Sequence, residues 1–431
     1  MKLRFSIAIP LLFISGCTTM PPGHPASYTQ PNILEKFETP SRTPAMFVPV
    51  TIEGDTYTCI LDTGAMATVF NRNLASKFGE KYRSLKLGQA ADGRRFTIEY
   101  YRPLPDVYLG ALNIRDRIRF GRIIDFPPHV ATIHGKQVDG IIGMDVLRDF
   151  VVQLDYDNGT VSLIESHKVR DFIPFYRRMP NAHSEWGEPI PLGYTSIFRL
   201  GLPTVKGTFS GAGPVEFIID SGFLTAGKAG SVSEGLLKKH ASINWIYRET
   251  YQSPGKTIAG ENPATSELMI AEKLDIGPFE YNGVLFSLDY YTLLGTQILM
   301  QHLVTFDFPN KVMYLKRGDH FGVIRLPNIP LADIGLNLTS DGHRYSVGVL
   351  TNSVAYSYGF REDDIITEID GRDVTDHEYA TIGGLLYSIY ESSTKDLVMT
   401  VVGLEGDREL RIPHSEMIKL APQCPRCGKR H

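Results

Sequence analysis

The chain has 431 residues, 42% of them hydrophobic, which is ordinary for a globular protein of about three domains with several cores. The formal net charge at pH 7 is −4, so no basic field favours nucleic acid as a partner. Cysteines are sparse, at four in the whole chain.

The N-terminus has the pattern of an export signal. Lys2 and Arg4 precede an apolar run at 5–14, which is too short for an ordinary membrane-spanning helix. Residues 14–17, Ile-Ser-Gly-Cys, resemble the lipobox of bacterial lipoproteins. The resemblance implies that Cys17 is lipidated after cleavage and that the protein is anchored in the bacterial cell envelope, at the outer membrane facing the periplasm. The alternative is a plain secretory signal with an incidental cysteine.

The next segment predicts a linker followed by strands. Residues 18–44 are rich in Pro, Thr and Ser, as in a linker that holds a folded body off a membrane. An apolar strand at 46–52, a turn at 53–55 and a second strand running to Asp62 follow. A helical turn is expected at 73–78.

Two apolar strands end in the same kind of tripeptide, an acidic residue, a hydroxyl residue and glycine: Asp62-Thr63-Gly64 and Asp220-Ser221-Gly222. Each is followed by an apolar-apolar-Gly segment, at Gly143 and Gly295, with separations of 81 (143−62) and 75 (295−220) residues. Each segment then continues into a stretch typical of a hairpin, at 151–163 and 304–315. Self-similarity at this long offset indicates a duplicated domain.

This pattern resembles retropepsin-type and pepsin-like aspartic proteases over residues 45–317. The resemblance implies a mainly β protein in which two retropepsin-like β-barrel lobes form a pepsin-like bilobal unit. It implies a catalytic pair, Asp62 and Asp220. It also implies supporting residues that bond across the floor of the site or permit its tight turns: Thr63, Gly64, Ser221 and Gly222. No metal or other cofactor is expected.

The expected chemistry is peptide-bond hydrolysis by an activated water. Two carboxyl groups in close contact cannot both ionise readily, so they share a proton. The ionised group takes a proton from water and the protonated group donates to the peptide carbonyl oxygen. Because the pair titrates as a unit, neither aspartate is assigned a fixed role.

One residue departs from the family pattern. The family usually has a small residue after the second glycine, whereas this chain has Phe223. The phenyl ring narrows the site or marks a lobe that has lost activity. The alternative function is therefore a non-catalytic peptide-binding lipoprotein built on a degenerate protease scaffold. A third reading, in which lobes of different molecules pair, is not required because one chain carries two unlike lobes.

A glycine-bearing turn at 88–93 precedes a strand at 96–101. In the family a hairpin here closes over the substrate as a flap, which implies that Asp92 and Gly93 form its tip. The alternative is an ordinary hairpin turn, in which Asp-Gly is common. Lobe 2 has a related run at 255–262. A run at 222–229 nearly matches a phosphate-binding loop, but Ala229 stands where the metal-binding hydroxyl belongs.

Beyond residue 318 the duplication stops, and the chain resembles a PDZ domain, an α+β fold. The resemblance implies that a loop captures a C-terminal peptide or a partner protein by strand addition, through Ile334, Gly335 and Leu336. The alternative is a docking module without a free groove. The C-terminal pair Cys424 and Cys427 predicts a small disulfide loop or a dispensable tail.

The whole chain thus predicts a lipid-anchored aspartic endopeptidase that acts on protein or peptide substrates. The expected boundaries are 1–17 for the signal and lipobox, 18–44 for the linker, 45–167 for lobe 1, 168–189 for the interlobe linker, 190–318 for lobe 2, 325–415 for the PDZ domain and 416–431 for the tail.

Overall fold

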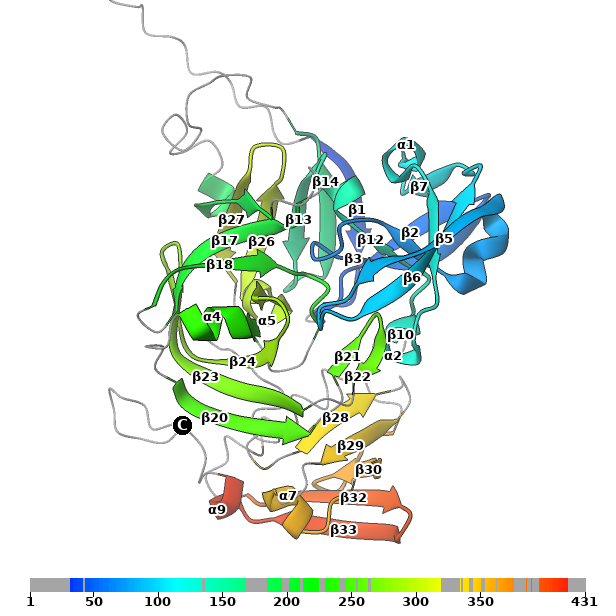
Figure 1. Ribbon diagram of the computed structural model, residues 1–431. Helices are drawn as coiled ribbons and strands as arrows, with labels where there is room; N and C mark the ends of the chain where they lie inside the picture. Colours follow the sequence, from blue (N-terminus) through cyan, green and yellow to red (C-terminus); the bar gives the residue numbers. More distant parts are fainter. Residues whose placement is uncertain are drawn as a thin grey trace, which may run out of the picture.

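The structure is a computed structural model (Figure 1). It describes residues 32–41, 43–133, 136–166, 184–195, 201–209, 212–224, 229–239, 245–252, 255–262, 265–318, 334, 336–340, 344–349, 353–361, 363–375, 385, 389 and 395–417. Of the predicted sites, Cys17, Gly335 and the cysteines of the tail lie outside the described residues.

Lobe 1 is built on a nine-stranded sheet. Its strands are β2 (Phe47–Ile52), β3 (Asp55–Leu61), β4 (Val69–Asn71), β5 (Glu80–Gln89), β6 (Arg95–Arg102), β7 (Val107–Leu109), β8 (Leu112–Asn113), β9 (Gly121–Ile124) and β12 (Gly140–Ile142). They lie in the order β5-β6-β9-β4-β12-β3-β2-β7-β8. The β2–β3 turn has positive φ at Glu53 and Gly54, as a tight hairpin turn requires.

Short helices and a two-stranded ribbon complete lobe 1. They are the 3-10 helix η1 (Arg72–Lys77), α1 (Arg115–Ile118), α2 (Pro128–Ala131), α3 (Met144–Leu147), and the strands β10 (Thr132–Ile133) and β11 (Lys136–Gln137). The helical turn expected at 73–78 is η1, whose side-chain cap is Asn71.

Lobe 2 is an eight-stranded sheet that curls back on itself. Its strands are β16 (Gly193–Tyr194), β17 (Pro203–Phe209), β18 (Ala212–Ile219), β19 (Gly230–Ser233), β20 (Trp245–Gln252), β23 (Thr265–Ile276), β24 (Phe279–Asp289) and β25 (Leu293–Leu294). Strand β17 pairs with both β18 and β23, so the sheet closes in the manner of a barrel. Helices α4 (Glu234–Lys239) and α5 (Thr296–Leu299) and the hairpin β21 (Gly255–Thr257) and β22 (Gly260–Asn262) belong to the same lobe.

A six-stranded sheet joins the two lobes (Figure 1). Its strands are β1 (Ile33–Glu38), β14 (Thr160–Ile164), β13 (Val151–Asp155), β26 (His302–Asp307), β27 (Val312–Arg317) and β15 (Glu188–Pro191), in that order. At its centre Gln153 faces Thr305, and their side chains are hydrogen-bonded at 2.9 Å. The two residues are 152 apart (305−153), as are Gly143 and Gly295, so equivalent positions of the lobes meet across a pseudo-two-fold axis.

This joining sheet corrects two predicted linkers. Residues 33–38, placed in the 18–44 linker, form β1 against β14. Residues 188–191, placed in the 168–189 linker and the start of lobe 2, form β15 against β27 and follow the 3-10 helix η3 (Ser184–Trp186). One apolar core runs through both lobes, and the mainly β, retropepsin-like fold expected from the sequence is confirmed.

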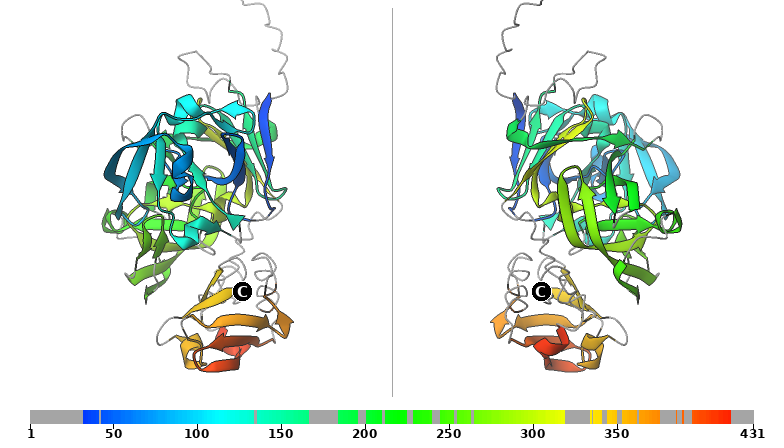
Figure 2. Two further views of the ribbon diagram at one scale, coloured as in Figure 1. Left: turned by 90° about the vertical axis from the view of Figure 1, so that its right-hand side faces the viewer. Right: turned by 90° about the vertical axis from the view of Figure 1, so that its left-hand side faces the viewer.

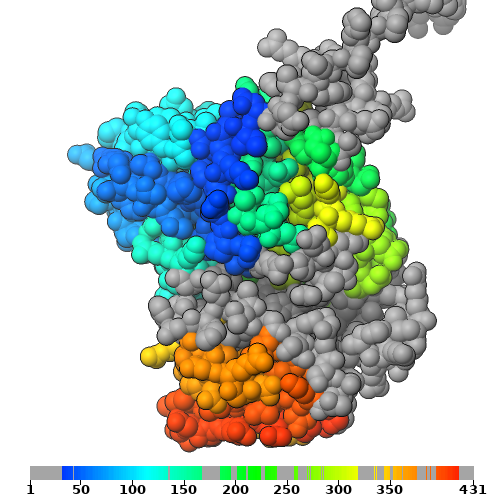
Figure 3. Space-filling model, turned by 180° about the vertical axis from the view of Figure 1, so that it is seen from behind, coloured from blue at the N-terminus to red at the C-terminus, as the bar shows by residue number. Residues whose placement is uncertain are grey.

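The C-terminal unit has a sheet and a core of its own. Its elements are β28 (Leu336–Ser340), β29 (Tyr345–Val349), β30 (Ile365–Ile369), β31 (Arg372–Asp373), β32 (Leu397–Gly403), β33 (Gly406–Ile412), α7 (Val354–Ser357) and α9 (His414–Met417). Figure 2 shows this unit in yellow to red below the lobes, and Figure 3 shows its surface at one end of the molecule. Its assignment as a PDZ domain stays a prediction.

Candidate active site

The same strand pairing positions both aspartates. In lobe 1, β3 runs parallel to β12, and the backbone N–H of Asp62 donates to the carbonyl of Ile142 at 3.0 Å. In lobe 2, β18 runs parallel to β25, and the backbone N–H of Asp220 donates to the carbonyl of Leu294 at 2.9 Å. Each apolar strand lies inside its sheet, so the polypeptide leaves the core at each aspartate.

Four reciprocal hydrogen bonds connect the two lobes beneath the aspartates. Thr63 Oγ1 accepts from the backbone N–H of Ser221 at 3.0 Å and donates to the carbonyl of Ile219 at 2.8 Å. Ser221 Oγ accepts from the backbone N–H of Thr63 at 3.0 Å and donates to the carbonyl of Leu61 at 3.1 Å. Thr63 and Ser221 are each 1% exposed. Each hydroxyl therefore satisfies buried backbone groups of the opposite lobe and fixes the distance between the two motifs.

The two glycines allow the carboxyl groups to lie side by side. Gly64 N–H donates to Asp62 Oδ1 at 2.7 Å, and Gly222 N–H donates to Asp220 Oδ1 at 2.9 Å. A methyl group at Gly64 would overlap the carboxyl group of Asp220, and one at Gly222 would overlap that of Asp62. Each carboxyl group thus occupies the space left by the glycine of the opposite lobe.

Burial and proximity keep a proton on this pair. Burial raises the pKa of Asp62, while the Gly64 N–H and a hydrogen bond from Asp220 oppose that rise. Burial, the charge of Asp62 and the same hydrogen bond raise the pKa of Asp220 well above its ordinary value. Both residues remain partly exposed, so the pair is also open to solvent. The arrangement supplies one proton donor and one proton acceptor side by side.

A buried ion pair supports the lobe 1 motif, and the sequence analysis missed it. Asp145 is 4% exposed, and its Oδ1 accepts from the Thr68 N–H and hydroxyl, both at 2.8 Å. Arg122 Nη1 lies 2.8 Å from Asp145 Oδ2. The Gly143 N–H donates to Thr68 Oγ1 at 3.2 Å, which links the ion pair to the glycine segment. Gln297 occupies the equivalent place in lobe 2 (297−145 = 152), so this charge is specific to lobe 1.

Phe223 lies against the glycine segment of its own lobe. A methyl group at Gly295 would overlap the Phe223 ring. The Phe223 carbonyl accepts from the Thr296 N–H at 3.3 Å and from its hydroxyl at 3.0 Å. In lobe 1 the equivalent carbonyl, that of Ala65, accepts from the Met144 N–H at 2.8 Å. Phe223 therefore makes the same backbone contact in lobe 2 that Ala65 makes in lobe 1.

Residues 48–146 match the family model of aspartyl proteases. The matched range contains Asp62, the hairpin β5–β6 and Gly143, so it spans the lobe 1 half of the site. A search of the curated proteins gives no match to the chain. The match supports an aspartic protease family, and so a hydrolase. It ends at residue 146, so the lobe 2 half of the site rests on its geometry.

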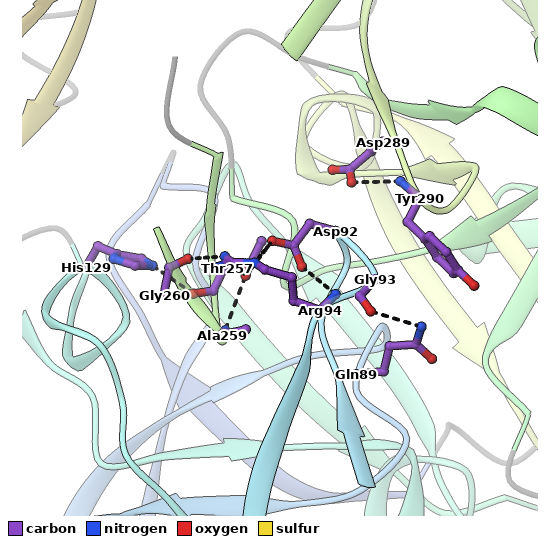
Figure 4. Close-up of polar contacts among 10 residues, drawn as sticks. All are labelled: Gln89, Asp92, Gly93, Arg94, His129, Thr257, Ala259, Gly260, Asp289 and Tyr290. Carbon is purple, nitrogen blue, oxygen red and sulfur yellow. Dashed lines mark hydrogen bonds and ion pairs between the residues drawn. The ribbon is translucent and has the colours of Figure 1, made fainter. Parts of the chain in front are cut away.

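The predicted flap residues form the tip of the β5–β6 hairpin. Asp92 and Gly93 lie in its turn, where Gly93 has a φ of 81° that suits glycine. A methyl group at Gly93 would overlap the Tyr290 ring of lobe 2, so the hairpin tip reaches the other lobe. Figure 4 shows this tip beside residues of lobe 2.

The remaining predicted residues lie elsewhere. Ile334 and Leu336 are 0% and 2% exposed and pack in the core of the C-terminal unit, where the Ile334 carbonyl accepts from the Ala355 N–H at 2.8 Å. Across the described ranges, no three His, Cys, Asp or Glu side chains gather in a way that could hold a metal ion.

Proposed function

We propose that the protein is an aspartic endopeptidase that hydrolyses peptide bonds with a water activated by Asp62 and Asp220. The observation that carries the proposal is the pair of carboxyl groups, each lying on the glycine of the opposite lobe above the Thr63–Ser221 bonds. The family match over lobe 1 supports the same class of reaction.

The proposed reaction uses the pair as a unit. The ionised carboxyl group takes a proton from water, and the resulting hydroxide character allows attack on the peptide carbonyl carbon. The protonated carboxyl group donates to the carbonyl oxygen, which gives a tetrahedral diol. The C–N bond then breaks as the amine nitrogen takes the proton that the first carboxyl group gained from water, and one diol hydroxyl returns its proton to the second carboxyl group. The N–H groups of Gly64 and Gly222 each hold one carboxyl oxygen, which orients both groups toward a shared water.

The test is cleavage of a diverse peptide library by the purified protein. We expect Asp62→Asn, Asp220→Asn and the double variant to be folded and similarly inactive, because removing either carboxyl group removes the shared proton. Asp55→Asn, an exposed position at the start of the strand that leads to Asp62, is the matched control and should keep wild-type turnover. A folded Asp220→Asn protein with wild-type turnover would contradict the two-lobe mechanism.

The wild type itself separates this proposal from the alternative scaffold function. A wild type that binds library peptides and cleaves none of them would favour the non-catalytic peptide-binding protein. Phe223→Ala refines the comparison because the ring lies against Gly295. If the ring only narrows the site, the variant should change substrate preference, and its peptide cleavage should still depend on both aspartates.

We also propose that the C-terminal unit binds a peptide C-terminus by strand addition, as a PDZ domain does. Its sheet and separate core support a self-contained unit, and Ile334 and Leu336 of the loop predicted to capture the carboxylate pack in that core. The full chain carrying Asp62→Asn should bind free C-terminal peptides more tightly than the same peptides with an amidated end. Equal binding of both forms would reject carboxylate capture.

We further propose that lipid on Cys17 anchors the protein in the bacterial envelope, at the outer membrane facing the periplasm. The lipobox pattern supports this proposal. No helix in the described part of the chain is long and apolar enough to cross a membrane. Cys17→Ser should release the protein from the membrane fraction, and unchanged retention would reject the anchor.

A further inference from the structure

One long strand of lobe 1 lies at the edge of its sheet. Strand β5 is ten residues long and stands first in the order β5-β6-β9, so among the described strands it pairs with β6 alone (Figure 1). It is the longest edge strand in the part of the chain that the structure describes. An edge strand turns the backbone N–H and C=O groups of alternate residues away from its sheet, and these groups can pair with a strand of another molecule.

The side chains of β5 are exposed on both faces of the sheet. Eight of its ten residues are exposed, and two of these carry large apolar side chains. Tyr82 is 64% exposed and Leu87 is 67% exposed, which places them among the most exposed large apolar residues that the structure describes. A partner that covered them would remove apolar surface from water, and this burial favours binding.

The hairpin strands carry a positive charge that the chain as a whole does not. Strands β5 and β6 together contain five Lys or Arg residues and two Glu residues, whereas the formal net charge of the chain is −4. Three of the basic residues, Lys81, Arg83 and Lys86, are exposed on β5 itself. A strand with acidic side chains would therefore meet opposite charge at this edge.

Aromatic rings hold two guanidinium groups in place beside the edge. Cζ of Arg83 lies 4.8 Å from the ring centroid of Tyr100 and 5.8 Å from that of Phe120. Cζ of Arg102, at the end of β6, lies 3.9 Å from the Phe120 centroid. Both arginines are nevertheless exposed. A guanidinium that lies over a ring keeps its N–H groups along its rim, so it can still bind a carboxylate through two parallel hydrogen bonds.

Basic residues and bulges also protect an edge strand against unwanted pairing. The β5–β6 register shifts at two places, which bends the strand, and it stays regular at 83–85 between them. Two copies of β5 would oppose like charges, which disfavours self-pairing. The same charges attract an acidic strand, so they select a partner. Protection alone does not account for the exposed apolar surface of Tyr82 and Leu87.

We propose that residues 81–87, the β5 edge, bind an extended acidic segment of a partner protein, which joins the lobe 1 sheet as a further strand. Backbone hydrogen bonds hold the segment, the basic residues select Glu and Asp, and Tyr82 and Leu87 receive its alternating apolar side chains. The same hairpin reaches lobe 2 through its tip, where Gly93 lies against Tyr290. The β5 edge is a different surface, so binding there does not require peptide cleavage.

Titration calorimetry of the full chain tests the proposal. The protein carries Asp62→Asn, so that cleavage does not consume the probe. The probe is a peptide of about eight residues in which Glu alternates with Val. Both its ends are blocked, because a free carboxyl end would suit the C-terminal unit. We expect one binding site per chain.

Two related peptides separate strand addition from attraction by charge alone. The peptide with Lys in place of Glu, and the Glu peptide N-methylated at every backbone amide, should each bind about tenfold more weakly or not at all. The N-methylated peptide keeps its charge but has no backbone N–H to donate. If it binds as well as the parent peptide, strand addition is overturned.

Charge changes on β5 locate the site. Lys86→Gln should weaken binding of the acidic peptide about threefold and Lys86→Glu about tenfold, in line with exposed charge pairs. Lys316→Glu is the matched control, because Lys316 is an exposed residue of β27, which lies inside the joining sheet. This variant should keep the affinity of the parent protein. If Lys86→Glu and Lys316→Glu weaken binding equally, the overall charge attracts the peptide and the proposal fails.

Hydrogen–deuterium exchange then identifies the strand that is covered. With the peptide at about ten times its Kd, the amides of 80–89 that face away from β6 should exchange about tenfold more slowly. The amides of β8, at the opposite edge of the same sheet, should be unchanged. Protection confined to other strands would overturn the proposal. In sedimentation the peptide should leave the oligomeric state unchanged, whereas a dimer that the peptide dissociates would make a second copy the occupant and overturn the acidic partner.

Discussion

The Thr63 hydroxyl offers the sharpest test of how the lobes are joined. Thr63→Val keeps the shape of the side chain but removes the acceptor of the Ser221 N–H and the donor to the Ile219 carbonyl. Both hydrogen bonds are buried, and Thr63 is 1% exposed, so each group left unsatisfied costs about 1–3 kcal/mol. The variant should therefore lose about 2–6 kcal/mol of the free energy of unfolding, a large share of the stability of a typical domain.

Urea unfolding followed by tryptophan emission measures this loss. Trp186 of η3 is buried in a cluster of the joining sheet, so tryptophan emission reports on the bilobal unit. The transition midpoint should fall with little change in its slope. Thr51→Val is the matched control, because the Thr51 hydroxyl makes only an exposed contact with Thr56, and it should cost less than about 0.5 kcal/mol. A Thr63→Val midpoint equal to that of the control would refute the reasoning.

Two further predictions concern the buried carboxyl groups. Because the folded pKa of Asp220 lies well above its ordinary value of 3.8, the folded protein keeps a proton that the unfolded chain releases, so stability falls as pH rises above about 4. Asp220→Asn should remove this loss and be more stable than the wild type at pH 7, by urea midpoint; a less stable variant would contradict the pKa shift. Asp145→Asn should cost about 3–5 kcal/mol by the same assay, because Arg122, whose side chain is 14% exposed, loses its partner. Asp149→Asn, an exposed partner of Arg117, is its control and should cost less than about 1 kcal/mol.

The centre of the candidate site could be predicted from the sequence because both aspartates stand in short repeated motifs. Asp62 and Asp220 each end an apolar strand, and duplication alone suggests that two such ends share one site. In the structure the two carboxyl groups lie side by side, each against the glycine of the opposite lobe. Their catalytic role remains a prediction.

The edges of the joining sheet could not be predicted locally. Strand β1 buries only Phe37, so it lacks the alternation that marks a half-buried strand. Strand β15 contains Pro189 and Pro191, which argue against a strand. Both prolines are tolerated because β15 is an edge strand, and that position is known only once the sheet has formed.

The polar pairs between residues far apart in the sequence could not be predicted either. Asp145 stands in an apolar run, and its burial could have been suspected there, but its partner Arg122 is 23 residues away. Arg94 and Gly260 lie on different lobes, 166 residues apart. Nothing in either local sequence specifies such a contact, because tertiary packing brings the groups together.

Strands β13 and β26 pair through equivalent positions of the two lobes, and this pairing shows what fusion of two lobes in one chain allows. In a symmetric pair of identical lobes, residue 153 would face its own copy, and a Gln–Thr hydrogen bond could not form. Here Gln153 faces Thr305, Thr63 exchanges hydrogen bonds with Ser221, and Asp145 has Gln297 as its counterpart. A peptide chain has a direction, from its amino end to its carboxyl end. A site with two unlike halves can distinguish that direction, whereas a perfectly symmetric site presents the same surroundings to both.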